Sequence, residues 1–174
     1  MAFRFFVFPD NLNNIKNSLK ILASESFTSV SSPIQYAAIS AFTKDLSNYV
    51  QRTKEILKKV GIYVYDNLKS NKILINKPEG GFYLMPEFIN DKFRTSSEMC
   101  KNIMDETGVA LLPGSEFGFS ENKMLARLSF TDFDGEKFLN NTSGCKKINR
   151  NILSKFAPNI LEGVSKLKHW SENI

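Results

Sequence analysis

Apolar residues recur along much of the chain at the spacing of one face of an α-helix. This spacing predicts helices over Asn11–Ser24, from Pro33 to Leu68, from Thr95 to Gly108, and over Gly135–Leu139, Ile148–Phe156 and Pro158–Trp170. The signal from Pro33 is the longest and allows a break near Thr43–Leu46. A helix this long can bridge two layers or two domains.

Turn-forming residues beside these stretches mark where several helices begin and end. Ser32-Pro33 predicts an N-cap followed by a proline in the first turn. The segment Thr95–Glu98 matches a capping box, and Gly108 suits the C-cap of the same helix. Gly61 lies inside the long stretch and costs about 1 kcal/mol relative to alanine. The apolar stripe continues past Gly61, so we expect the helix to continue as well.

Shorter apolar or alternating runs between the helices predict strands. They are Phe5–Phe8, Lys72–Asn76, Gly81–Met85, Val109–Leu112 and Met124–Phe130. Phe5–Phe8 is apolar throughout, so we expect a fully buried strand that ends at Pro9-Asp10. The order of the elements predicts an α+β fold, in which helices cover a small mixed sheet and a long helix precedes it.

The composition is that of a globular protein and narrows the candidate functions. Of the 174 residues, 42% are hydrophobic and 24% are charged, which suits one domain or one domain with a piece of another. The net charge of +5 comes with lysines scattered among apolar residues, which indicates solvated helix faces and no nucleic-acid site. No apolar run is long enough to span a membrane and no signal peptide is visible, so we expect a soluble cytoplasmic protein.

Cysteine and histidine do not form a recognisable site. Cys100 and Cys145 are far apart, and His169 has no partner motif. We therefore expect two reduced thiols, no metal site and no Cys/His nucleophile.

Arg127 is the first candidate for chemistry. It lies inside the predicted strand Met124–Phe130, on the face opposite to Leu128. An arginine among apolar strand neighbours must reach solvent or meet an anion, and its planar fork suits a carboxylate bidentately. On strand position alone, an edge-strand arginine that extends to solvent is favoured over an anion site.

Two glycine-containing loops are further candidates. The predicted strand before Pro113-Gly114 runs into a loop that ends at Gly118, where the backbone can approach a ligand closely. Gly80-Gly81 precedes another strand and permits a positive φ. Each segment alone is equally typical of an ordinary strand-end or hairpin turn.

Together and in this order, the segments resemble the small domain of class I/II, fold-type I aminotransferases, which depend on pyridoxal phosphate. The resemblance rests on Pro78-Glu79-Gly80-Gly81-Phe82-Tyr83, Glu106-Thr107-Gly108-Val109-Ala110, Leu112-Pro113-Gly114-Ser115-x-Phe117-Gly118 and Ala126-Arg127-Leu128-Ser129-Phe130. Upstream, Ser29–Ala38 is similar to the start of the family's long interdomain helix, and Phe6–Pro9 to the strand after its cofactor-lysine motif. The resemblance covers nearly the whole chain.

The resemblance implies a function for Arg127. In this family an arginine in an Ala-Arg-Leu-Ser type of strand binds the α-carboxylate of the substrate, and Arg127 occupies that position. The family transfers an amino group between an amino acid and a 2-oxo acid, with pyridoxal phosphate as the electron sink. The resemblance does not identify the amino donor. It also implies that the whole enzyme is a homodimer.

The cofactor-binding residues are expected to lie elsewhere. The family's Schiff-base lysine belongs to a Ser-Lys…Gly-x-Arg-x-Gly pattern, which this sequence does not contain. Arg4 is the candidate for the phosphate-binding arginine of that pattern, although alignment on Phe6–Pro9 places it slightly late. We therefore expect no catalytic residue in this chain, no pyridoxal phosphate bound by it alone and no transamination by it alone.

These expectations divide the chain into three parts. Residues 1–32 correspond to a remnant of the large cofactor-binding domain, 33–70 to the connecting helix region and 71–174 to the small C-terminal domain. The chain is then a C-terminal piece of an aminotransferase that lacks its large domain. The alternative is a non-catalytic binding or regulatory module that pairs with a full-length aminotransferase. An unrelated α+β domain with chance motifs is the third reading.

Overall fold

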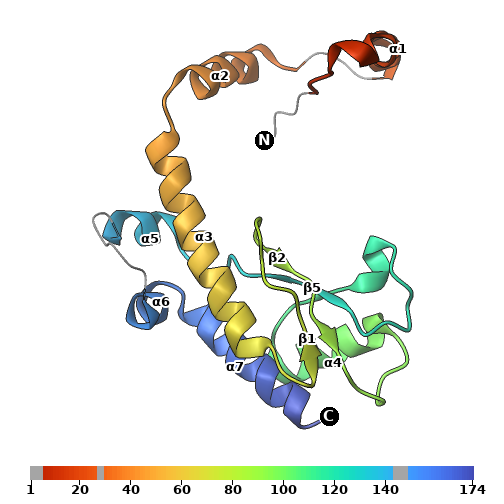
Figure 1. The fold of residues 1–174 in the computed structure, drawn as a ribbon, viewed down its shortest axis with the longest axis vertical. Helices are drawn as coiled ribbons and strands as arrows, with labels where there is room; N and C mark the ends of the chain where they lie inside the picture. Colours follow the sequence, from red (N-terminus) through yellow and green to blue (C-terminus); the bar gives the residue numbers. More distant parts are fainter. Residues whose placement is uncertain (1–5, 27–29, 143–148) are drawn as a thin grey trace. The chain divides into compact units, whose positions relative to one another are not determined.

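The structure is a computed structural model that describes residues 6–26, 30–142 and 149–174. It divides into two compact units, residues 1–47 and residues 48–174. Each unit is described by itself below, with the labels of Figure 1.

The first unit contains a short 3₁₀ helix, η1 (Asp10–Leu12), and the helices α1 (Asn13–Ser26) and α2 (Ser32–Thr43). α1 agrees with the helix predicted over Asn11–Ser24. α2 begins with Pro33 in its first turn, and its N-cap is Ser31, one residue earlier than predicted. No residue of α1 or α2 is buried.

The buried strand predicted over Phe5–Phe8 is not found, and this prediction is wrong for the residues that the structure describes. Phe6–Phe8 form no strand, and the side chains of Phe6 and Val7 are 84% and 82% exposed. A fully buried strand needs neighbours that accept its backbone hydrogen bonds and cover both faces. Among the described residues, no strand pairs with this segment.

The long helical signal is interrupted where the sequence allowed a break. Lys44 takes an extended conformation after α2, and the Asp45 carboxylate accepts a hydrogen bond from the backbone N–H of Ser47 at 2.9 Å. The helix α3 (Ser47–Leu68) begins there. It runs through Gly61 without ending, as predicted.

Gly61 allows α3 to lie very close to the sheet. A Cβ atom at this position would stand 2.9 Å from Cζ of Phe130 and 3.3 Å from Cγ of Pro78. Phe130 is only 1% exposed, so it has little space into which to move. The glycine therefore lets helix and sheet approach more closely than alanine would.

In the described part of the second unit there are five short strands. β2 (Tyr83–Leu84), β5 (Ala126–Ser129) and β4 (Leu112–Pro113) form one sheet with β5 in the middle, and β1 (Ile73–Leu74) pairs with β3 (Glu87–Phe88). A bridge between Glu87 and Leu125 joins the two sheets. Every strand pair among the described residues is antiparallel, so the sheet is not the mixed one predicted. The α+β class itself is confirmed.

Helices cover this sheet and close one apolar core (Figure 1). They are α3, α4 (Ser96–Thr107), α5 (Gly135–Asn141), α6 (Arg150–Phe156) and α7 (Pro158–Glu172). The N-cap half of the capping box is confirmed, because Oγ1 of Thr95 accepts a hydrogen bond from the N–H of Glu98; the Glu98 carboxylate accepts from the N–H of Arg94, one residue before the cap. Gly108 ends α4 with φ +74°. α4 packs on α7, where Nε1 of Trp170 donates to Oδ1 of Asn102 at 3.0 Å.

Candidate functional site

Arg127 lies on the central strand of the three-stranded sheet. It faces Leu112 of β4 across one ladder, while Tyr83 of β2 pairs with Ser129 on the other side. Ala126 and Leu128 point into the core, with exposures of 0% and 5%, as the alternation predicted. Arg127 lies on the other face and is half-buried. The interpretation as an edge-strand arginine is therefore wrong, since strands flank β5 on both sides.

Two aromatic rings contact the guanidinium group of Arg127. Its Cζ atom is 4.4 Å from the ring centroid of Tyr83 and 4.3 Å from that of Phe117. Tyr83 belongs to β2 and Phe117 follows β4, so the rings reach Arg127 from the two strands that flank β5. A guanidinium over an aromatic ring is attracted by the negative face of the π-system. Among the described residues, the contacts of the Arg127 side chain are these two rings, and its guanidinium forms no side-chain hydrogen bond or ion pair with them.

The loop after β4 holds Phe117 beside Arg127. The N–H of Gly114 donates to the carbonyl oxygen of Leu125 at 2.7 Å, and a Cβ on Gly114 would lie 2.9 Å from that oxygen. The loop continues as a 3₁₀ turn, η2 (Gly114–Phe117), and ends at Gly118 with φ +81°. Gly114 thus brings the loop close to Leu125, in the segment just before β5.

The Gly80-Gly81 loop leads into the second aromatic partner. Gly81 has φ +69°, as predicted for a glycine before this strand. The next residue, Phe82, accepts a hydrogen bond from the N–H of Phe130 at 3.2 Å. Its ring centroid lies 4.3 Å from that of Tyr83. The register of β2 on β5 therefore places Tyr83 next to Arg127.

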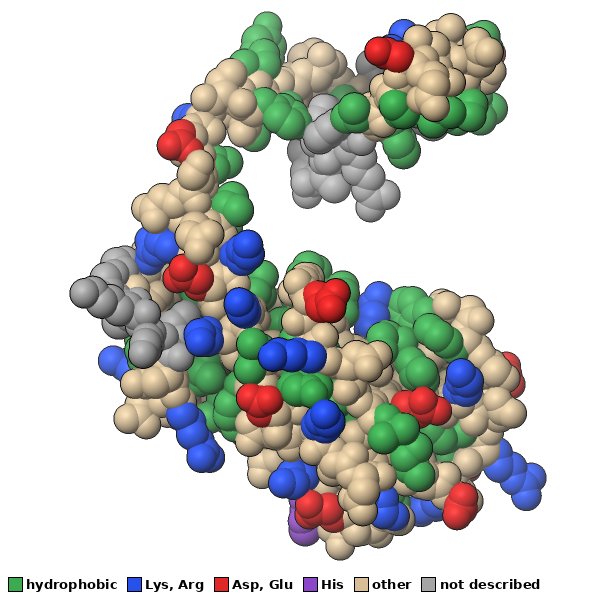
Figure 2. Space-filling view, in the orientation of Figure 1, with side chains coloured by type: hydrophobic (Ala, Val, Ile, Leu, Met, Phe, Trp, Pro, Cys, Tyr) green, Lys and Arg blue, Asp and Glu red, His purple; other side chains and the backbone are tan. Residues whose placement is uncertain are grey.

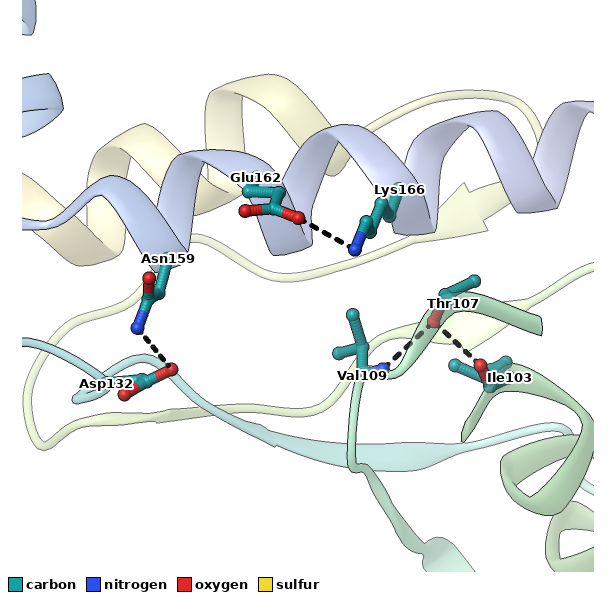
Figure 3. A network of polar contacts seen from close by, with 7 residues as sticks. All are labelled: Ile103, Thr107, Val109, Asp132, Asn159, Glu162 and Lys166. Atoms are coloured by element: carbon teal, nitrogen blue, oxygen red, sulfur yellow. Dashed lines mark hydrogen bonds and ion pairs between the residues drawn. The ribbon is translucent and has the colours of Figure 1, made fainter. Parts of the chain in front are cut away.

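A separate cleft of about 550 Å³ lies between the N-terminal half of α7, the end of β5 and the turn after α4. At its rim, Nδ2 of Asn159 donates a hydrogen bond to Oδ2 of Asp132 at 3.2 Å, and Nζ of Lys166 forms an ion pair with Oε1 of Glu162 at 2.7 Å (Figure 3). Oγ1 of Thr107 accepts a hydrogen bond from the N–H of Val109 and donates one to the carbonyl oxygen of Ile103 (Figure 3). Arg127 does not line this cleft, and the polar groups in view are already paired with one another.

The other chemical expectations concern thiols and metals. Within residues 6–26, 30–142 and 149–174, no group of three His, Cys, Asp or Glu residues could hold a metal ion. Cys100 is buried, and burial raises the pKa of its thiol to about 11. A thiol with this pKa is a poor nucleophile at neutral pH. Cys145 and Arg4 lie outside the described residues. No helix in the described part is long and apolar enough to cross a membrane.

Tyr83 and Phe117 were not singled out as partners of Arg127 from the sequence. Both lie in the segments that carry the family resemblance, so the signal for their importance was present. Their contact with Arg127 depends on which strands flank β5, and spacing along the chain does not reveal that order.

Comparison with known proteins identifies the family. Residues 6–138 match the family model of aminotransferase class I and II, and the chain belongs to this family. It is 31% identical over 121 residues to an aspartate aminotransferase of Sulfolobus acidocaldarius, covering 67% of this chain and 30% of that protein. It is 35% identical over 100 residues to a probable N-acetyl-LL-diaminopimelate aminotransferase of Bacillus subtilis, covering 58% of this chain and 25% of that protein.

Solved structures of aminotransferases share the fold. An alanine aminotransferase from Pyrococcus furiosus superposes with a TM-score of 0.67 over 95% of this chain and 36% of its own, at 19% identity. An aspartate aminotransferase from Thermotoga maritima superposes with a TM-score of 0.61 over 90% of this chain and 33% of its own, at 22% identity. The chain thus spans about a third or less of the length of these relatives.

Class I/II aminotransferases depend on pyridoxal phosphate, and the surroundings of Arg127 do not fit that group. Holding it requires an amine for the covalent link, an acid for the pyridine nitrogen and donors for the phosphate. The described contacts of the guanidinium are two aromatic rings, without an amine or a carboxylate. Arg127 and its two rings therefore lack the groups that would hold pyridoxal phosphate.

Proposed function

We propose that this chain is the C-terminal part of a class I/II aminotransferase and that Arg127 binds the α-carboxylate of its amino-acid and 2-oxo-acid substrates. The family match supports the first half of this proposal, and the surroundings of Arg127 support the second. In the whole enzyme, pyridoxal phosphate supplies the electron sink for the amino-group transfer. The contribution of this chain is to bind and orient the substrate.

The guanidinium of Arg127 is the observation that carries the proposal. It is half-buried on a central strand and has no anionic partner among the described residues. Its five N–H donors form a fork that matches the two oxygens of a carboxylate. A carboxylate bound there is held in one orientation, because two parallel hydrogen bonds fix its plane.

The exposed apolar side chains of the first unit support a longer protein. Figure 2 shows apolar side chains on the surface of its helices. They include Ile15, Leu19, Ile21, Leu22, Tyr36, Ile39 and Phe42, with exposures from 43% to 74%. Such surfaces normally contact another domain or subunit. We propose that residues 1–32 belong to the large domain, 33–70 to the connecting helices and 71–174 to the small domain.

The carboxylate site is tested by NMR on the 174-residue protein. The side-chain Nε–H signal of Arg127 is followed while pyruvate or L-alanine is added. The methyl esters of the same compounds serve as matched ligands without a carboxylate. We expect the acids to shift the signal at millimolar concentrations and the esters to leave it unchanged.

Variants separate the fork from the charge. Arg127→Lys keeps the charge and loses the bidentate geometry, so pyruvate should bind about ten- to a hundredfold more weakly, as read from the backbone amide shifts of β5, because lysine has no Nε–H signal. Arg94→Gln, at an exposed arginine outside the sheet, should bind pyruvate as the natural chain does. Equal affinity in the Arg127→Lys variant would show that the bidentate fork does not contribute, and unchanged affinity in Arg127→Gln would show that Arg127 is not the carboxylate ligand.

The status of the chain is tested by the size of the protein in its source cells. An antibody raised to this chain should detect a protein about two to three times as long, in line with a two-domain enzyme. The 174-residue protein with added pyridoxal phosphate should not transaminate. A native protein of this length would favour the non-catalytic module that pairs with a full-length aminotransferase, and turnover at an enzyme-like rate would contradict the predicted inactivity.

A further inference from the structure

We propose that Tyr83 and Phe117 are positioning residues that hold the guanidinium of Arg127 by its two faces and leave its N–H edge open for a carboxylate. This inference rests on the proposed function and adds two residues to it. The ring centroids lie 4.4 and 4.3 Å from Cζ of Arg127 and belong to chain segments on either side of β5.

Each ring is held by backbone contacts that do not involve Arg127. Tyr83 pairs with Ser129 in the β2–β5 ladder, and the preceding residue also bonds to the β5 side. Phe117 closes the turn that Gly114 anchors on Leu125. The rings are therefore set by the sheet and the loop, and the arginine side chain adopts the position between them.

Such an arrangement lowers the entropic cost of binding. A free arginine side chain populates many rotamers, and a ligand that binds it must restrict them. Contacts on both faces restrict those rotamers in advance. The ring faces that contact the guanidinium carry no oxygen or nitrogen acceptor, so the N–H groups at its edge stay available to a ligand.

The exposure of the rings agrees with this function. Tyr83 is 43% exposed and Phe117 is 40% exposed, although large aromatic side chains normally bury most of their surface. Both partly exposed rings lie over the guanidinium of Arg127, the single basic residue of β5 (Ala126–Ser129).

The test uses the full 174-residue chain and measures Arg127 directly. Relaxation of its Nε–H group is recorded without any ligand, and pyruvate affinity is recorded separately. The variants Tyr83→Leu and Phe117→Leu remove one ring each, while Tyr83→Phe and Phe117→Tyr keep a ring. Phe119→Leu is the matched control, because Phe119 is 43% exposed in the same loop and is not among the described contacts of Arg127.

We expect an ordered Nε–H group in the natural chain and a mobile one in each leucine variant. Each leucine variant should bind pyruvate about two- to fivefold more weakly, as the loss of one exposed cation–π contact predicts. The aromatic replacements should restore both the order and the affinity, and the Phe119→Leu control should change neither. A purely structural function of the rings would lower the Tm of the leucine variants and leave the order of the Arg127 Nε–H group unchanged.

Two results separate this inference from the proposed function. If pyruvate binds and the leucine variants leave both the order and the affinity unchanged, the positioning function is refuted while the carboxylate site stands. If the natural chain does not bind pyruvate but the leucine variants lose order at Arg127, the rings still position the guanidinium and the carboxylate function is refuted.

Discussion

Replacing Gly114 by alanine tests whether the close approach of the loop to β5 supports the site. A Cβ atom at this position would lie 2.9 Å from the carbonyl oxygen of Leu125 and 3.0 Å from its Cβ, where ordinary contacts begin at 3.4 Å. One of the clashing atoms is backbone, so the loop itself must move by about 0.5 Å. The hydrogen bond from Gly114 to Leu125, 2.7 Å long, must lengthen or bend with it.

The expected cost follows from two opposing effects. Overpacking costs about 1–3 kcal/mol, and weakening one backbone hydrogen bond adds up to about 1 kcal/mol. The alanine side chain also restricts the unfolded chain, which offsets about 0.4–1 kcal/mol of this loss of stability, because Gly114 does not need a positive φ. We expect Gly114→Ala to lower the free energy of unfolding by about 1–3 kcal/mol and the Tm by about 3–10 °C.

Trp170 is a suitable reporter of this change. It is the single tryptophan, it is 3% exposed, and it stacks on Phe93 at 5.9 Å in the core of the second unit. Urea unfolding followed by its fluorescence and by circular dichroism gives the free energy of unfolding. The same sample should bind pyruvate more weakly, because the shifted loop moves Phe117 away from Arg127.

Gly135→Ala is the matched control. A Cβ at Gly135 would meet nothing within 4 Å, and the residue begins α5 without a positive φ. This variant should be neutral or slightly stabilised, by up to about 1 kcal/mol. If Gly114→Ala and Gly135→Ala have the same free energy of unfolding, the close packing of the loop on Leu125 does not hold the loop in place, and the predicted clash is refuted.

Three further predictions concern other positions. Gly61→Ala should lower the free energy of unfolding in urea by about 1–2 kcal/mol, although alanine has the better helix propensity, because the new Cβ meets the buried ring of Phe130 at 2.9 Å. Adding Phe130→Leu should recover part of the loss caused by Gly61→Ala. Additive losses in the double variant would contradict this explanation. Thr95→Ala should lower the free energy of unfolding by about 1 kcal/mol, because it removes the cap of α4, whereas Thr95→Ser should be near neutral. Equal stabilities of the two variants would argue against capping. In a Cys145→Ser background, Cys100 should resist iodoacetamide until the pH nears 11, while the urea-unfolded chain reacts from about pH 9. Because burial raises the pKa of Cys100, the protonated thiol stabilises the folded chain fully below pH 9, and this contribution is lost as the pH rises toward 11. A native thiol that reacts at pH 8 would show that Cys100 is accessible.

Local patterns in the sequence were sufficient for the helices and their ends. The capping box at Thr95, the C-cap at Gly108 and the break before Ser47 were predicted, because each depends on residues within a turn of one another. The family was also predicted from the order and spacing of short motifs, and the family match confirms it. Arg127 was identified as the candidate carboxylate ligand on the same basis.

Strand pairing depends on residues that are distant in the chain, and the sequence did not determine it. β3 was not predicted, yet it is the partner of β1. Phe6–Phe8 have the composition of a buried strand but lack neighbours among the described residues. A strand exists only where a partner offers backbone hydrogen bonds.

For the site, the sequence by itself determined which side chain could meet a carboxylate, and the tertiary structure decided how that side chain is presented. The sequence placed Arg127 on a strand with its apolar neighbours facing the core, because alternation is a local property of the backbone. Only the pairing order β2–β5–β4 put this strand in the middle and brought Tyr83 and Phe117 to the guanidinium. These contacts join residues far apart in the chain, and the close approaches at Gly114 and Gly61 that support them arise only when the sheet, loop and helix are packed together.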